Sequence, residues 1–150
     1  QTVNVLQAVV LTDAEKMVLT PTYYVFKMYK DHQENTLVGS YITTDEIESS
    51  YDNQKFPQLV ESASVDENGT VYSTITNTSS SKSAKIKCQI ADTKIKSLKA
   101  EILTGDMHAR NDFDNTDSVK IEEFKDFRML KDGFTATIPA CSVVKFIAER

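Results

Sequence analysis

Acidic side chains are the most numerous groups in this chain that could carry out chemistry. The 150 residues include 22 Asp and Glu but two histidines, His32 and His108. Two carboxyl groups can divide acid and base roles when their surroundings push their pKa values apart. The acidic clusters here lie in polar runs, where nothing would bury a carboxyl group. We therefore predict exposed surface acids and no catalytic pair; the clustered acids are Asp45, Glu46, Glu48, Glu122 and Glu123.

Metal and cofactor chemistry is poorly supported. Neither histidine has a convincing second ligand three or four residues away, and we expect His32 to be the exposed end of a helix. The run from Asp112 to Asp117 lacks the glycine and the distal glutamate of an EF-hand loop, which leaves calcium as a weaker alternative. The chain has no zinc-type cysteine spacing and four glycines in all. We predict no metal and no cofactor.

Gln7 is the polar residue with the strongest claim to a site. It interrupts residues 3–11, whose apolar character on both faces is typical of a fully buried, usually parallel, strand. An amide in such a strand must be hydrogen-bonded or face a polar cavity. Gln7 is either a ligand contact or a structural amide that ties neighbouring strands together; we expect Asn4 to be structural.

A helix follows this predicted strand. Thr20 and Pro21 form a helix-start signal, with an N-cap residue before a proline at the first helical position. The helix is predicted to run to about Gln33, with a polar stripe on one side. A parallel strand needs parallel neighbours, and the chain after Gln33 supplies none. We expect residues 1–36 to be the end of a larger α/β unit.

From residue 37 onward the hydrophobic period is two, which predicts an antiparallel β-sandwich. Asn68-Gly69 indicates a hairpin turn, and Pro139 separates the two strands of a predicted closing pair. The segment 43–54 is either an exposed loop or a cover pinned by Ile47 and Tyr51. Residues 104–127 carry no strong period. The predicted strands are 37–42, 59–65, 70–77, 84–90, 95–103, 134–138 and 142–148.

Charge and cysteine content limit the partners. A net charge of −5 argues against nucleic acid, which requires a concentrated basic patch. No apolar run reaches the length of about 18 residues that a membrane span needs. Cys88 falls in an inward series and is expected to be a buried free thiol, with a Cys88–Cys141 disulfide as the alternative. No signal peptide is visible, and the compartment is left open. The lysines at alternating positions are expected to form solvated faces; they are Lys82, Lys85, Lys87, Lys94, Lys96 and Lys99.

Five stretches together resemble one enzyme family. The runs NVLQAVVLTD and EKMVLTPTYYVFKMYKDHQ are similar to the last strand and helix of the catalytic (β/α)8 barrel in family 51 glycoside hydrolases, the α-L-arabinofuranosidases. The likeness continues in SASVDENGTVYSTITN, EILTGDMHARNDFDNTDSV and IPACSVVKF. It covers nearly the whole chain in the family's order.

The resemblance implies a fragment with two parts. Residues 1–36 would be the last strand and helix of a truncated barrel, and residues 37–150 the C-terminal, jelly-roll-like β-sandwich. Both catalytic glutamates of the retaining family would lie upstream of this chain. Gln7 would correspond to the glutamine of the family's NVLQ, a contact to the arabinofuranosyl ring. Arg110 departs from the family's A-H-N-x-F pattern, and we expect Phe113 to anchor its loop rather than contact a ligand.

The resemblance predicts an accessory role. The parent enzyme would release terminal arabinofuranosyl groups from arabinan or arabinoxylan, while the sandwich supports the barrel and a homo-oligomer. One alternative is a carbohydrate-binding module, although the absence of Trp counts against it. A second alternative is a stand-alone structural or adhesion sandwich.

Overall fold

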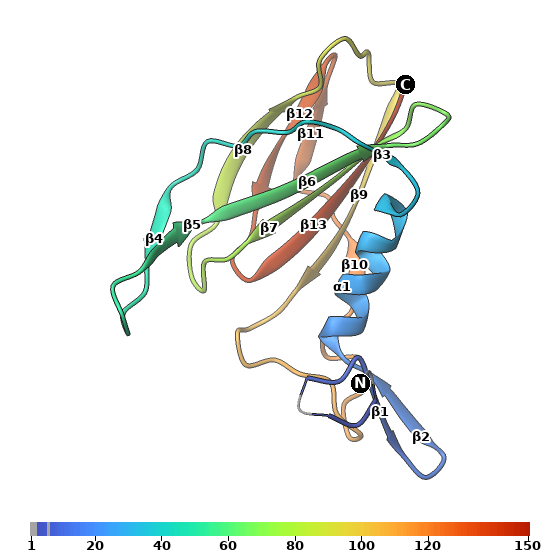
Figure 1. Ribbon diagram of the computed structural model, residues 1–150, viewed down its shortest axis with the longest axis vertical. Coiled ribbons are helices and arrows are strands. Elements are labelled where there is room, and N and C mark those ends of the chain that lie inside the picture. The colour runs from blue at the N-terminus through green and yellow to red at the C-terminus, as the bar shows by residue number, and fades with distance from the viewer. Residues whose placement is uncertain (1–2, 6) are drawn as a thin grey trace.

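Strands make up most of the regular structure in residues 3–5 and 7–150, which are the residues that the computed structural model describes. One short helix, α1, and one 3-10 turn, η1, precede most of the strands (Figure 1). The elements in chain order are β1 (Val10–Asp13), β2 (Lys16–Leu19), α1 (Pro21–Tyr29), η1 (Lys30–His32), β3 (Thr36–Leu37), β4 (Glu46–Glu48), β5 (Lys55–Pro57), β6 (Leu59–Val65), β7 (Val71–Asn77), β8 (Ala84–Gln89), β9 (Ser97–Thr104), β10 (Ile121–Glu123), β11 (Phe127–Leu130), β12 (Gly133–Ile138) and β13 (Ser142–Glu149).

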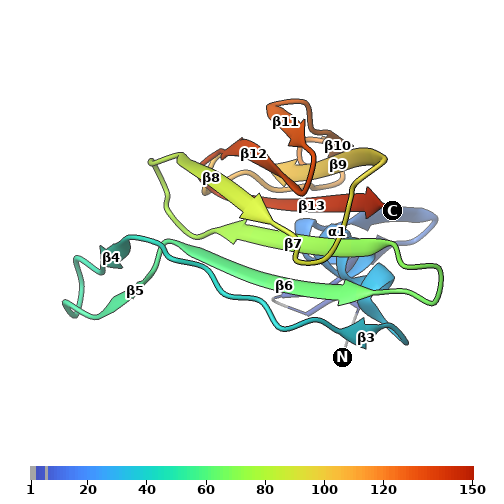
Figure 2. The same cartoon turned by 90° about the horizontal axis from the view of Figure 1, so that it is seen from above.

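Two antiparallel sheets pack face to face, and the predicted sandwich is confirmed. The large sheet has the strand order β10-β9-β13-β7-β6-β3, and the small sheet has the order β11-β12-β8. Figure 2 shows the small sheet as a separate layer over the large one. The alternation expected for β8 holds, since Ile86 and Cys88 pack against the core while Lys85 and Lys87 are exposed.

Aromatic side chains fill the space between the sheets. Phe134 of β12 stacks on Phe146 of β13 with ring centroids 4.1 Å apart, and both rings are fully buried. Phe124 meets Phe146 edge to face at 6.0 Å. Cys88 lies beside this core as a free thiol whose pKa is raised by burial, and Cys141 is also free. The prediction of a free thiol at Cys88 is therefore confirmed, although the side chain is half-buried rather than buried, and the disulfide alternative is wrong.

The predicted closing pair around Pro139 is wrong. β12 pairs with β8 and β11 in the small sheet, whereas β13 pairs with β7 and β9 in the large sheet. The connection between the two strands crosses from one sheet to the other through Cys141, which has a φ of 46°. The apolar faces of the two strands therefore meet across the core instead of lying side by side.

The opening of the chain also differs from its prediction. Residues 3–11 do not form a buried parallel strand: Val3 makes one parallel bridge to Val10 and is 45% exposed, and Leu6 lies outside the described residues. Regular pairing begins at Val10, where β1 and β2 form an antiparallel hairpin. A strand needs a hydrogen-bonding neighbour, and for β1 the described chain supplies β2.

The predicted helix is present and covers the large sheet. α1 begins at Pro21 as expected and lies on the sheet face opposite the core, where Met28 is fully buried (Figure 1). Thr20 precedes the helix in an extended conformation, but its hydroxyl makes no capping bond. It donates instead to the carbonyl oxygens of Ala8 at 2.7 Å and Val9 at 3.1 Å, which ties the start of the helix to the preceding segment.

The acidic segment 43–54 is an exposed arm. It forms most of the hairpin β4–β5, which projects from one end of the sandwich (Figures 1 and 2). Tyr51 is 96% exposed and pins nothing, while Ile47 is half-buried. The strand predicted for residues 37–42 is limited to Thr36–Leu37.

The β6–β7 hairpin forms at the predicted place with a different turn. Gly69 has a φ of 85°, whereas Asn68 is not among the residues with positive φ. The loop is held by Asp66, whose Oδ1 accepts hydrogen bonds from the backbone N–H groups of Asn68 and Thr70. Hydrogen bonds to the Asp66 side chain thus hold this turn, which lacks the second positive-φ residue of a two-residue turn.

Candidate functional site: the helix-covered face of the large sheet

The outer face of the large sheet carries the most developed side-chain network, and α1 and η1 lie over it. Its apolar part is built around Met28, Leu103 and Val119, all buried, with Val25 and Val143 packed against them. The alternation of the strands produces this second buried face, because Leu103 and Val143 point away from the core to which their neighbours Ile102 and Val144 belong.

Lys145 is the charged centre of the same face. The lysine is 4% exposed, and its Nζ lies 2.5 Å from Asp31 Oδ2 and 3.0 Å from Glu101 Oε2. Burial alone would lower the pKa of Lys145, but the hydrogen bonds to Asp31 and Glu101 outweigh burial and raise it. The ammonium group therefore stays charged and joins η1, β9 and β13.

His32 is a half-buried connector rather than an exposed helix end, which corrects the prediction. Its Nδ1 lies 2.9 Å from Ser64 Oγ and its Nε2 lies 2.7 Å from Thr74 Oγ1. One ring nitrogen donates and the other accepts in the neutral form. Burial lowers the pKa of His32, with a further lowering from the charge of Lys145 and an opposing effect from Asp31. The lowered pKa thus favours the neutral imidazole at this site.

Asn111 fastens the first hairpin to the long irregular segment. Its amide nitrogen donates to Leu19 O at 2.8 Å and Val119 O at 2.7 Å, and its Oδ1 accepts from Val119 N at 2.7 Å. The side chain is 3% exposed, so these bonds are shielded from water. Sequence reasoning missed Asn111, although it stands between the two residues, Arg110 and Phe113, that were considered. The sequence held one sign of this role. Asn111 follows the apolar Ala109 by two residues and does not pair with a neighbouring residue in a turn motif.

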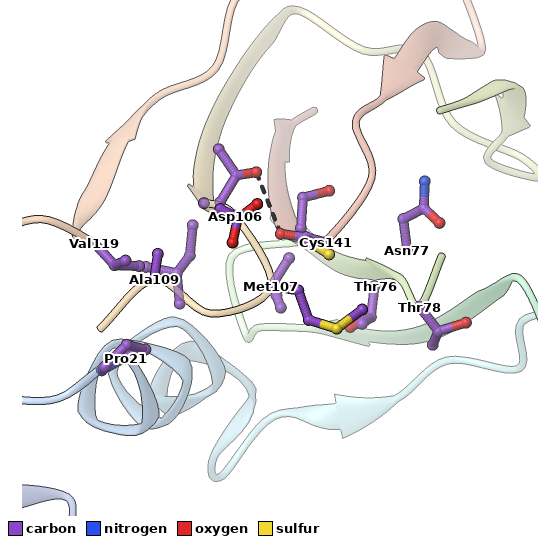
Figure 3. Close-up of a pocket in the computed structure, with 14 residues that line it drawn as sticks. Pro21, Thr76, Asn77, Thr78, Asp106, Met107, Ala109, Val119 and Cys141 are labelled. Carbon is purple, nitrogen blue, oxygen red and sulfur yellow. Dashed lines mark hydrogen bonds between the residues drawn. The ribbon is translucent and has the colours of Figure 1, made fainter. Parts of the chain in front are cut away.

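A shallow hollow of about 360 Å³ opens beside the N-terminal end of α1 (Figure 3). Pro21, Met107 and Val119 contribute apolar surface to it, and Asp106 lies at its edge. Thr104, one of three threonines that line the hollow, donates a hydrogen bond to Cys141 O at 3.2 Å. Asp106 is the one carboxylate among the lining residues in the described part of the chain, so the hollow has no acid pair for general acid/base catalysis.

The predicted surface acids are confirmed as exposed. Asp45, Glu46 and Glu48 lie on the projecting arm, and Glu122 and Glu123 lie on the edge strand β10. Within residues 3–5 and 7–150, no group of three or more His, Cys, Asp or Glu is arranged to hold a metal ion.

The Asp112–Asp117 run forms a turn. The carboxylate of Asp112 accepts hydrogen bonds from the backbone N–H groups of Asn115 and Asp114, and these bonds lower its pKa. A side chain committed to its own loop in this way is a turn residue. Phe113, the expected anchor, is half-buried.

Gln7 stands apart from both the network and the hollow. Its side chain is exposed in a turn before β1, so the buried-strand argument that singled it out does not apply. It is not among the residues that line the hollow.

Among the described residues, the helix α1 is too short and too polar to cross a membrane.

The chain matches the family described as the alpha-L-arabinofuranosidase C-terminal domain over residues 1–142. It belongs to that family. An "Intracellular exo-alpha-L-arabinofuranosidase" from Bacteroides ovatus is 37% identical over 145 residues, which are 96% of this chain and 28% of that protein. The resemblance seen in the sequence motifs is thereby confirmed.

Solved structures agree with the family. The GH51 arabinofuranosidase from Xanthomonas axonopodis pv. citri matches 99% of this chain with a TM-score of 0.92 and 32% identity, over 30% of its own length. The alpha-L-arabinofuranosidase from Thermotoga maritima, solved with arabinose, matches with a TM-score of 0.83 and 25% identity, over 33% of its length. This arabinofuranosidase C-terminal domain thus spans about a third or less of the relatives it matches.

Proposed function

We propose that this chain is the accessory C-terminal part of a retaining α-L-arabinofuranosidase and does no catalysis alone. The parent enzyme would release terminal arabinofuranosyl groups from arabinan or arabinoxylan. The observation that carries the proposal is the 0.92 TM-score over 99% of the chain to an arabinofuranosidase more than three times as long. The exposed positions of the clustered acids support it further, because retaining hydrolysis needs two carboxyl groups about 5–5.5 Å apart in a shaped site.

The assignment of the chain to two domains is part of this proposal. Residues 1–36 would belong to the catalytic barrel, and residues 37–150 would form the sandwich that supports it. The barrel would cover apolar side chains that are exposed near the start of this chain: Phe26 of α1 is 65% exposed and Met17 of β2 is 62% exposed. Exposed groups of this kind, grouped on neighbouring elements, are typical of interaction surfaces. A homo-oligomer of the parent is also proposed, on the family resemblance.

The first experiment measures the size of the native protein. An antibody raised against this chain is used on a lysate of the source cells. We expect a band heavier than 16.8 kDa by at least a barrel of roughly 250 residues. A band at 16.8 kDa would contradict the proposal and favour the stand-alone sandwich.

The second experiment measures catalysis directly. The 150-residue chain is incubated with an aryl α-L-arabinofuranoside, and the longer protein, captured with the same antibody, serves as the positive control. We expect turnover by the longer protein, with retained anomeric configuration in the product, and none by the chain. Turnover by the chain alone would overturn the accessory role.

Gln7 is proposed as a substrate contact in the longer enzyme. Its exposed side chain leaves the amide free to reach a sugar hydroxyl, and the family resemblance assigns it that role. In the longer enzyme, Gln7→Ala is expected to raise KM or lower kcat/KM by about tenfold, the value of one hydrogen bond to a substrate. Asn4→Ala is the neighbouring control, because its amide is occupied by Thr12. Equal kinetics for wild type and Gln7→Ala would remove Gln7 from the site.

A further inference from the structure

The outer face of the small sheet carries a group of cations with no assigned role. Lys85 and Lys87 of β8 and Arg128 of β11 are all exposed on strands whose other side packs against the core. None of the three forms an ion pair within residues 3–5 and 7–150. The chain as a whole has a net charge of −5, so the charge of these three side chains is opposite to that of the whole chain.

The register of the small sheet fixes how these cations lie. Lys87 pairs with Thr135, which pairs on its other side with Arg128, so the three side chains form one cross-strand row. Lys85 pairs with Thr137 in the next row on the same face, beside Asp126, whose carbonyl oxygen accepts the N–H of Thr137. Side chains two apart on a strand are about 6.6 Å apart, and adjacent strands are about 4.8 Å apart. Three cations and two half-exposed threonines therefore share one area of the sheet. Two carboxylates lie at its margins: Asp126 beside Thr137, and Asp132, whose Oδ2 accepts a hydrogen bond from Gln89, the neighbour of Lys87 on the same face.

The chemistry of this face selects among ligands. A neutral sugar chain is usually held by aromatic platforms, and the two rows contain none. A nucleic acid needs a denser basic surface and a less acidic protein. Threonine hydroxyls bond sugar hydroxyls, while separated cations attract separated carboxylates. An extended sheet face also suits an extended polymer.

We propose that this face, defined by Lys85, Lys87, Arg128, Thr135 and Thr137, binds uronic-acid-bearing polysaccharide. It would hold the protein near acidic polysaccharide backbones. The proposal goes beyond the proposed function and requires no activity from the chain.

The test is affinity electrophoresis through native gels that contain polygalacturonate, with neutral linear arabinan in parallel gels. The wild-type chain is compared with a triple variant of the face, Lys85→Gln/Lys87→Gln/Arg128→Gln. The matched control, Lys16→Gln/Lys27→Gln/Lys30→Gln, removes three exposed cations from β2, α1 and η1, so both variants have the same net charge. Circular dichroism verifies that all three proteins are folded.

We expect polygalacturonate to retard the wild type and the matched control, and the face variant to bind about tenfold more weakly. Retardation should fall at high salt and be absent in neutral arabinan, because exposed charge pairs are screened. The proposal would be overturned by no retardation of the wild type, by equal loss in both variants, or by equal retardation by single-stranded DNA. Sedimentation that shows copies of the chain associating through this face, with the face variant monomeric, would also overturn it.

Discussion

The Nε2 atom of His32 lies 2.7 Å from Thr74 Oγ1, so a ring on the turn after the helix is bonded to an interior strand of the large sheet. The other ring nitrogen reaches Ser64 on the next strand. Two strands and the helical segment thus depend on one imidazole in its neutral form.

The stability of the chain should therefore fall as the pH is lowered through the titration of His32. Burial holds the folded-state pKa of His32 below the ordinary histidine value of 6.5, so the unfolded chain binds the proton first. The contribution is fully present above pH 6.5, is lost as the pH falls below it, and stops changing below the folded-state pKa. Urea unfolding at several pH values measures it. The His32→Gln variant should lack this slope, and a slope unchanged by that substitution would disprove the assignment.

Removing the two carboxylate partners of Lys145 should lower the unfolding free energy more than replacing Lys145 itself. In the double variant Asp31→Asn/Glu101→Gln the ammonium group stays buried without a carboxylate, which is expected to cost about 3 kcal/mol of unfolding free energy. Lys145→Met keeps the volume and leaves two carboxylates that are 39% and 42% exposed and can be solvated. It should cost clearly less. Chemical denaturation ranks the two, and the reverse order would contradict the argument.

Asn111→Ala is predicted to destabilise the chain by about 3 kcal/mol, because three hydrogen bonds are lost and the buried Val119 N–H is left without its acceptor. Amide hydrogen exchange at Val119 should accelerate in parallel. Asn68→Ala, at an exposed turn, is the matched control and should change stability little. Normal protection at Val119 in the Asn111→Ala variant would show that another acceptor takes over.

Gly133→Ala should disrupt the small sheet. A Cβ at this position would lie 2.0 Å from the carbonyl oxygen of Cys88, a backbone atom that cannot move without breaking the pairing of β12 with β8. We expect a loss of more than about 2 kcal/mol, seen as a lower thermal midpoint. Gly39→Ala is the control, since its Cβ would meet nothing within 4 Å. Equal midpoints for the two variants would refute the close contact.

Periodicity and turn residues were sufficient to predict most of the sandwich. β8 alternates apolar and charged residues because one face packs on Phe134 and the other meets water, so the pattern directly records burial. Pro21 likewise marks the start of α1. These features depend on residues close together in sequence.

The parts that could not be predicted depend on residues far apart. Nothing local distinguishes β12 and β13 as a hairpin from the same strands in opposite sheets, because both arrangements bury the same apolar residues. His32 was assigned to solvent because its partners, Ser64 and Thr74, are 32 and 42 residues away. The apolar run at residues 3–11 was equally ambiguous, since a run without alternation does not show which neighbour satisfies its backbone.

The burial of Lys145 also has a consequence for the assembly of the large sheet. On β13 it lies between Val144 and Phe146, which face the aromatic core, while Lys145 faces the helix. Because neighbouring residues of a strand point to opposite faces, a one-residue slip of β13 would drive the ammonium group into the ring stack and expel Phe146. The misaligned sheet would combine an unpaired buried charge with a missing core ring. Lys145 thus opposes any one-residue shift of β13 between β7 and β9.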